Sequence, residues 1–106
     1  MSEKEFLIYL DEAQENRYRY WHVWEQGKII EFRIQYEAFI SGSWHPVVRY
    51  DSAHGHPHRD DLHPNAPETK EWFPEYRNAD VLSIGQRDIV ANWPSYRAEY
   101  EKEMRR

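Results

Sequence analysis

Four of the six histidines in this 106-residue chain lie within ten residues of one another, in a segment rich in other polar side chains. The histidines are His54, His56, His58 and His63, and their polar neighbours are Arg49, Tyr50, Asp51, Arg59, Asp60 and Asp61. Imidazole is the commonest metal-ligating side chain, and the only one whose unperturbed pKa lies near neutral pH. The segment therefore predicts a metal site or a site of proton transfer.

The metal interpretation rests on a spacing of two. It puts four potential ligands on one side of an extended chain: His54, His56, His58 and Asp60. In a straight strand His54 and His58 lie about 13 Å apart, because alternate residues are about 6.6 Å apart. Zinc–nitrogen bonds measure only about 2.0–2.1 Å, so a shared ion requires a bend, which Gly55 and Pro57 allow. We expect a divalent metal such as zinc or manganese, with Asp51 or His63 completing the ligand set.

The second interpretation needs no metal and assigns catalysis to four residues: His54, His58, Arg59 and Tyr50. An imidazole that moves a proton beside an arginine that stabilises phosphate charge can cleave RNA. Tyr50 shares its alternation parity with Trp44 and Val48, so a place in the core is the competing expectation. The three nearby aspartates would repel a phosphate unless they pair with the arginines or hold a cation.

An antiparallel sheet must position this segment. In residues 29–40 every second residue from Ile30 to Ile40 is apolar, whereas positions 31, 33, 35 and 37 are polar, which predicts a strand with one buried side. Residues 17–25 and 44–51 predict neighbouring strands, joined to it by turns at 26–28 and 41–43, and 68–73 predicts a short further strand. Residues 52–67 contain one glycine, three prolines and four histidines, which predicts a long loop or a broken hairpin.

Two helices complete the expected fold. Residues 2–15 predict a short amphipathic helix, because Ser2 and Glu5 have capping-box spacing and apolar residues recur at helical intervals. From Asn78 onward apolar residues step by three or four, and Pro94 should kink this long helix or start a second segment. We expect an α+β fold in a single domain, 1–106, with an antiparallel sheet of three to five strands, a long C-terminal helix packed on one face and a short N-terminal helix.

Composition excludes several classes of protein. The 16% of aromatic residues are enough to build a core, although 31% of residues are charged. The absence of cysteine excludes disulfide frameworks, thiol nucleophiles and Cys-ligated zinc. A formal charge of −5 argues against non-specific wrapping of a nucleic-acid backbone. No apolar run approaches the roughly 20 residues that cross a bilayer, and no secretory signal is visible, so we expect a cytoplasmic protein that does not engage membranes.

The signature Tyr-Asp-x-Ala-His-Gly-x-x-His-Arg-Asp runs from Tyr50 to Asp60. Through it the chain resembles a family of small uncharacterised bacterial and archaeal proteins, which brings no activity with it. More distantly, the Tyr-Asp and His-Gly-His-x-His elements are similar to TumE-like toxins of toxin–antitoxin systems. That similarity implies a small cytoplasmic toxin paired with a DNA-binding antitoxin, although the longer acidic C-terminal helix departs from those toxins.

Three functions remain open at this point. The first is a toxin-like enzyme that cuts RNA with the His/Arg/Tyr cluster and has an antitoxin-like protein as its partner. The second is a non-enzymatic partner-binding domain, whose His-rich loop is a structural clasp that a metal could hold. The third is an interaction protein that forms a homodimer through an exposed strand edge or an aromatic face. A surface loop whose histidines have no chemical role is the plainest alternative to all of them.

Overall fold

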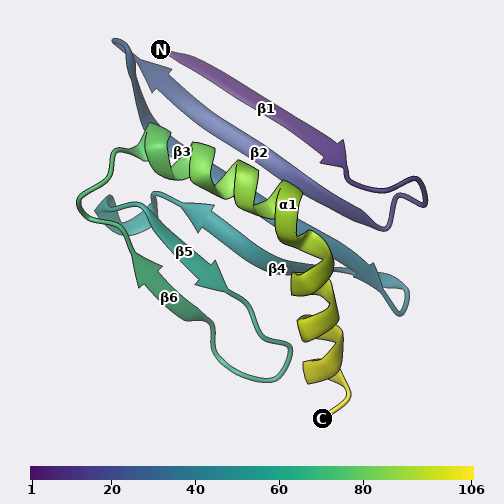
Figure 1. Cartoon of the computed structure of the whole chain (residues 1–106). Coiled ribbons are helices and arrows are strands. Elements are labelled where there is room, and N and C mark those ends of the chain that lie inside the picture. Colours follow the sequence, from purple (N-terminus) through teal and green to yellow (C-terminus); the bar gives the residue numbers. More distant parts are fainter.

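The alternation in the sequence becomes a six-stranded antiparallel meander in the computed structural model, which describes residues 1–106 (Figure 1). The strands lie side by side in chain order: β1 (Ser2–Tyr9), β2 (Asn16–Glu25), β3 (Lys28–Ile40), β4 (Ser43–Asp51), β5 (His58–Asp61) and β6 (Thr69–Trp72). A short 3-10 turn, Ala53–Gly55, separates β4 from β5, and one helix follows the sheet, α1 (Asn78–Met104). The α+β class and the long C-terminal helix are confirmed.

Two tight turns fix the register of the three central strands. Gln26 and Gly27, between β2 and β3, have φ values of 51° and 78°. Ser41 and Gly42, between β3 and β4, have φ values of 51° and 87°. Positive φ at both central residues is the requirement of a type I′ hairpin turn, whose twist matches that of the strands. Both turns therefore lie within the predicted ranges, 26–28 and 41–43.

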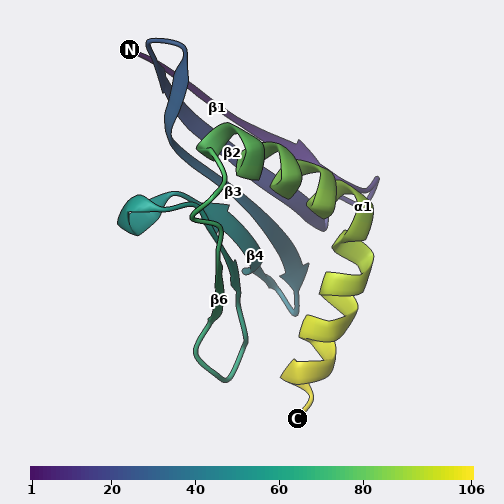
Figure 2. The same cartoon turned by 60° about the vertical axis from the view of Figure 1, so that its left-hand side comes forward.

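The core forms where α1 crosses one face of the sheet, chiefly over β3 and β4 (Figures 1 and 2). The buried face of β3 carries Phe32, Ile34, Tyr36, Ala38 and Ile40. From the helix, buried Val81, Leu82 and Ile89 meet them. Every second residue of the sheet thus points toward α1, and the alternate residues point to the opposite, open face.

The helix bends along its length, and Pro94 lies within it (Figure 1). Proline removes a backbone donor and clashes with the preceding turn, which is the expected cause of a bend. Beyond the proline, the Arg97 guanidinium donates to the carbonyl oxygens of Glu15 and Phe39 at 3.1 and 2.9 Å. The second half of α1 is therefore tied to the ends of β2 and β3 rather than left free.

The predicted N-terminal helix over 2–15 is wrong, because residues 2–9 form β1. This strand pairs with the outer edge of β2 over its full length, from Ser2 opposite Trp24 to Tyr9 opposite Arg17. Its Phe6 ring stacks on Tyr20, with 4.3 Å between ring centroids. Pairing eight residues and forming aromatic cross-strand contacts outweighs a capping-box spacing.

The predicted range of three to five strands is also wrong, since there are six. The additional strands are β1 and β5, and β5 lies inside the segment 52–67 that was expected to be a loop or broken hairpin. Its four residues alternate His58, Arg59, Asp60, Asp61, and none of them is apolar. Because polar side chains fill both faces of β5, hydrophobic periodicity gives no indication of this strand.

Candidate metal centre

The pairing of β4 with β5 brings a histidine and two aspartates together on the open face. Asp51, the last residue of β4, lies opposite His58, the first residue of β5, and Arg49 lies opposite Asp60. Neighbouring residues of a strand point to opposite faces, whereas residues two apart share a face. Asp51, His58 and Asp60 therefore converge, and they are only 3%, 1% and 2% exposed.

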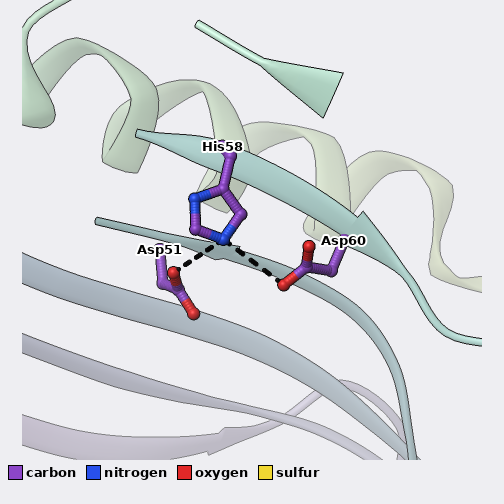
Figure 3. Close-up of side chains that lie close together, drawn as sticks. All are labelled: Asp51, His58 and Asp60. Atoms are coloured by element: carbon purple, nitrogen blue, oxygen red, sulfur yellow. Dashed lines mark ion pairs between the residues drawn. The ribbon is translucent and has the colours of Figure 1, made fainter. Parts of the chain in front are cut away.

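One ring nitrogen of the His58 imidazole faces both carboxylates (Figure 3). Its Nε2 lies 3.0 Å from Asp51 Oδ1 and 3.4 Å from Asp60 Oδ2. Its Nδ1 lies 3.1 Å from the carbonyl oxygen of His56. One potential ligand atom from each of the three residues lies within 4.8 Å of the other two, so the residues form a buried group that could hold a metal ion.

The hydrogen bonds of His58 determine what its Nε2 must carry. A carbonyl oxygen only accepts, so Nδ1 beside His56 bears the proton. Nε2 then points an electron pair at two carboxylates unless it binds a cation. That cation is either a second proton, which makes an imidazolium, or a metal ion. A metal-bound histidine usually donates its other ring N–H to a carbonyl or carboxylate, as Nδ1 does here.

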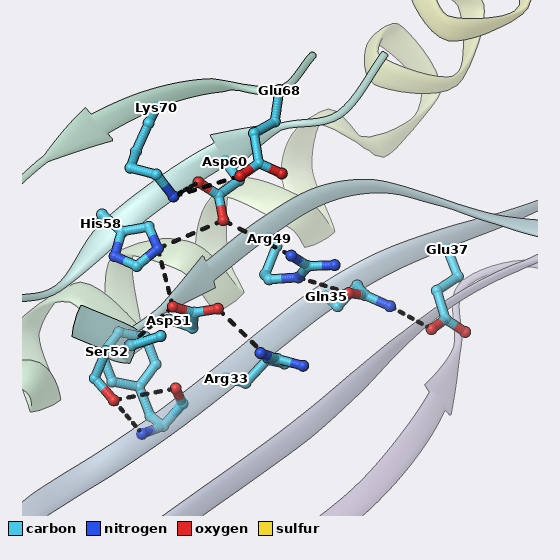
Figure 4. Close-up of polar contacts among 12 residues, drawn as sticks. Arg33, Gln35, Glu37, Arg49, Asp51, Ser52, His58, Asp60, Glu68 and Lys70 are labelled. Atoms are coloured by element: carbon cyan, nitrogen blue, oxygen red, sulfur yellow. Dashed lines mark hydrogen bonds and ion pairs between the residues drawn. The ribbon is translucent and has the colours of Figure 1, made fainter. Parts of the chain in front are cut away.

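Three cationic side chains orient the two carboxylates (Figure 4). Lys70 Nζ lies 2.5 Å from Asp60 Oδ1, and this hydrogen bond raises the pKa of the lysine. Arg33 Nε lies 3.4 Å from Asp51 Oδ2, while Arg49 lies 3.8 Å from Asp60 Oδ2. The two shorter contacts use the carboxylate oxygens that do not face the imidazole. Each aspartate thus bridges His58 and a surface cation, and no buried side-chain polar atom lacks a partner.

The chain does bend before His58, as a shared site would require. His54 and Gly55 have φ values of 69° and 93°, in the left-handed region. The bend brings the His54 and His58 rings to a centroid distance of 6.4 Å, with 30° between the ring planes. His54 and His56 remain exposed and lie outside the ligand cluster. Of the predicted metal ligands His54, His56, His58 and Asp60, the structure brings together only the last two, with Asp51 as the third.

The four predicted catalytic residues are divided between the two faces of the sheet. His58 points to the open face, whereas Arg59 and its partner across the ladder, Tyr50, point toward α1. His54 lies on the exposed turn between β4 and β5. The sheet itself separates the imidazole of His58 from the guanidinium of Arg59, so these four side chains do not meet at one phosphate.

Tyr50 and Arg59 belong to a second polar cluster, centred on Asp88 of α1. Asp88 Oδ2 accepts hydrogen bonds from Tyr50 at 2.6 Å and Tyr96 at 2.7 Å, and Arg59 lies 3.4 Å from it. Burial raises the pKa of Tyr96 to about 12, and its hydrogen bond to Asp88 adds to the rise. Burial and the same aspartate also raise the pKa of Tyr50. Both phenols stay protonated at neutral pH and join the sheet to the helix.

Sequence reasoning missed Asp88 and Tyr96, together with the two cations that hold the metal candidate, Arg33 and Lys70. The first pair lies two helical turns apart on α1, and neither is close in sequence to the His-rich segment. Arg33 and Lys70 reach the site only through the ladder, opposite Asp51 and Asp60. Only the register of β3 to β6 reveals that Arg33 and Lys70 lie beside the two aspartates.

Among the comparisons with known proteins, one match covers the whole chain. A family model described as a domain of unknown function, DUF7718, matches residues 1–106. Neither the curated proteins nor the solved structures include one that matches. The helix α1 contains no stretch apolar enough to cross a membrane. The expectation of an uncharacterised domain family is confirmed, while the TumE-like relationship and the cytoplasmic location stay predictions. Because the match covers its full length, the chain belongs to the DUF7718 family.

Proposed function

We propose that this protein binds a divalent cation, zinc or manganese, through Asp51, His58 and Asp60. The observation that carries the proposal is the spacing of the ligand atoms around His58 Nε2, at 3.0 and 3.4 Å. Around a metal with bonds of about 2.0–2.2 Å, neighbouring ligands lie about 3.0 Å apart in an octahedron and about 3.4 Å apart in a tetrahedron. One nitrogen and two carboxylate oxygens suit either metal.

The role of such a cation is to fix the turn between β4 and β5. Asp51 ends β4 and His58 begins β5, so a shared ion would close the chain segment 52–57 at its base. Asp51 Oδ1 also accepts the backbone N–H of Ala53, and His58 holds the His56 carbonyl. Closing a loop with a metal restricts the unfolded chain and stabilises the folded one.

A proton competes with the metal ion for His58 Nε2, and the surrounding positive charges favour the proton over a divalent ion. Arg33, Arg49 and Lys70 already balance the two carboxylates, so a divalent ion adds charge to a positive environment. The Arg33 side chain is 52% exposed, so solvent screens its share of this repulsion. We therefore expect binding that is strengthened at higher pH, because a proton on Nε2 must leave before the metal binds.

The test measures metal content and thermal stability of untagged protein, purified without chelator or metal resin. We expect close to one equivalent of zinc or manganese, and a melting temperature that falls with EDTA and recovers when the metal returns. At a metal concentration 100 times Kd, stabilisation is about 2.7 kcal/mol, which shifts the melting temperature of a 100-residue domain by roughly 10–20 °C.

A pair of adjacent substitutions provides the matched comparison. Asp60→Asn removes a ligand oxygen, whereas Asp61→Asn makes the same chemical change one residue along, where the carboxylate pairs with Arg59 on the opposite face. Asp60→Asn should weaken metal binding at least tenfold, and Asp61→Asn should leave it unchanged. Protein without metal, whose melting temperature responds neither to EDTA nor to added zinc or manganese, would falsify the proposal and assign the position to a proton.

RNA cleavage by a toxin-like protein is a second candidate, favoured by the exposure of His54 and His56 on the turn that His58 holds. Both imidazoles are exposed, so a substrate could reach them for proton transfer. Induced expression should then arrest growth and degrade RNA, and His54→Ala with His56→Ala should relieve the arrest at an unchanged melting temperature. Normal growth at high expression would remove this candidate.

A further inference from the structure

A cavity of about 660 Å³ lies at the end of the sheet where three distant segments meet. The turn between β2 and β3 forms one side, the turn at 55–57 another, and residues 74–79, where α1 begins, the third. Figures 1 and 2 both show the teal turn before β5 beside the green segment that leads into α1. Ligand pockets commonly measure about 300–1,000 Å³, so this one is large enough for a small molecule.

The charge of this cavity is opposite to that of the molecule. Its lining includes Lys28, His56 and Arg77 and no aspartate or glutamate, although the chain carries a formal charge of −5. Three other hollows in the surface each include an acidic residue, among them Glu5, Asp61 and Glu101. Arg77 lies 3.1 Å from Asp80, whereas Lys28 makes no ion pair. An anion would therefore find at least one cation uncompensated here.

Two aromatic side chains line the same cavity, and each is about half exposed. Trp24 is 46% exposed and Tyr76 is 53% exposed, so neither is needed to fill the core. Tyr76 is nevertheless fixed in place, since its ring meets Phe73 edge-on at 6.1 Å and its backbone N–H donates to the Phe73 carbonyl. Exposed aromatic faces beside cations are the pattern on which nucleobases stack.

We propose that this cavity binds a nucleoside phosphate, either a free mononucleotide or the phosphorylated end of an RNA strand. The base stacks on Trp24 or Tyr76, and the phosphate pairs with Lys28 and Arg77. This proposal does not depend on the metal site, since none of Asp51, His58 and Asp60 lines the cavity. The two regions are nonetheless adjacent, because the turn at 55–57 lines the cavity and His58 Nδ1 holds its His56 carbonyl.

The test is a titration of the full chain by calorimetry, with tryptophan fluorescence as a second readout. The ligands are the four ribonucleoside monophosphates, the corresponding nucleosides, inorganic phosphate, and a short RNA with or without a 5′ phosphate. We expect monophosphates to bind at least tenfold more tightly than nucleosides or phosphate. If only the phosphorylated RNA binds, the ligand is an RNA end rather than a free nucleotide, and the proposal stands.

Matched variants locate the binding. Lys28→Gln should weaken binding at least tenfold, and Lys102→Gln, which removes the same charge from the exposed C-terminal turn of α1, should not. Tyr76→Ala should weaken binding, while Tyr9→Ala, at another exposed tyrosine 42% accessible on β1, should leave it unchanged. No binding of any ligand, equal binding of phosphate and nucleotides, or equal effects of Lys28→Gln and Lys102→Gln would each overturn the proposal.

Discussion

Gly85 is the residue at which α1 comes closest to the sheet. A Cβ at this position would lie 2.8 Å from Cγ and Cδ1 of Tyr50 and 3.1 Å from Cγ2 of Ile34. The Tyr50 ring cannot rotate away easily, because its hydroxyl is held by Asp88 at 2.6 Å. The missing side chain of Gly85 thus lets the helix lie flat on β3 and β4, and it allows the tyrosine to join the two elements.

Gly85→Ala should therefore destabilise the protein, although alanine is the better helix former. Overpacking a core costs about 1–3 kcal/mol, whereas the gain in helix propensity is about 0.8–1.0 kcal/mol. The expected net loss is up to about 2 kcal/mol in the free energy of unfolding, measured by urea denaturation. Ser83→Ala, on the exposed face of the same helix, is the control and should be neutral or slightly stabilising. A Gly85→Ala protein that is as stable as the wild type would show that the helix can shift without cost.

The strands and the helix differ in how far their sequences predict them. Residues 29–40 bury one face against α1, and their alternation, unbroken over 30–38, identifies most of β3. The apolar steps after Asn78 likewise predict α1 from its first residue. Both elements bury one face and expose the other, which is the condition under which periodicity is informative. The segments 2–15 and 52–67, where the predictions differ from the structure, lack that condition.

Prediction of the candidate site from the sequence is limited in the same way, because the site depends on which residues of neighbouring strands pair. His58 and Asp60 could be selected from the sequence because their spacing of two puts them on one face of any extended chain. The sequence indicates Asp51 only as a further ligand, since its place opposite His58 depends on the register of β4 and β5. The separation of Tyr50 and Arg59 from His58 follows from that register as well. Residue type therefore indicates which chemistry is possible, and strand pairing decides which residues come together.

At the scale of the whole molecule, charge makes the fold sensitive to acid. The chain has 19 acidic and 14 basic residues and six histidines. Once the carboxylates are protonated, only positive groups remain, and their mutual repulsion opposes the compact state. Among the carboxylates, that of Asp88 matters most for the contact between the sheet and α1. Burial alone would raise the pKa of Asp88, but the hydrogen bonds it accepts and the charge of Arg59 outweigh burial and lower it.

The sign of the resulting pH dependence follows from that shift. Because the pKa of Asp88 is lower in the folded than in the unfolded protein, the unfolded state binds the proton more readily. The stabilisation is complete above about pH 5 and is lost as the pH falls through the ordinary aspartate value near 3.9 and toward the folded value. Asp88→Asn should accordingly flatten the fall in unfolding free energy between about pH 5 and pH 3, measured by urea denaturation at each pH.

Asp80→Asn is the control, since the pKa of Asp80 is also lowered, but by hydrogen bonding to the exposed Arg77. In 0.5 M salt the effect of Asp80→Asn should vanish while that of Asp88→Asn persists, because salt screens an exposed pair far more than a partly buried one. Identical pH profiles for Asp88→Asn and wild type would mean that the polar cluster does not couple protonation to folding.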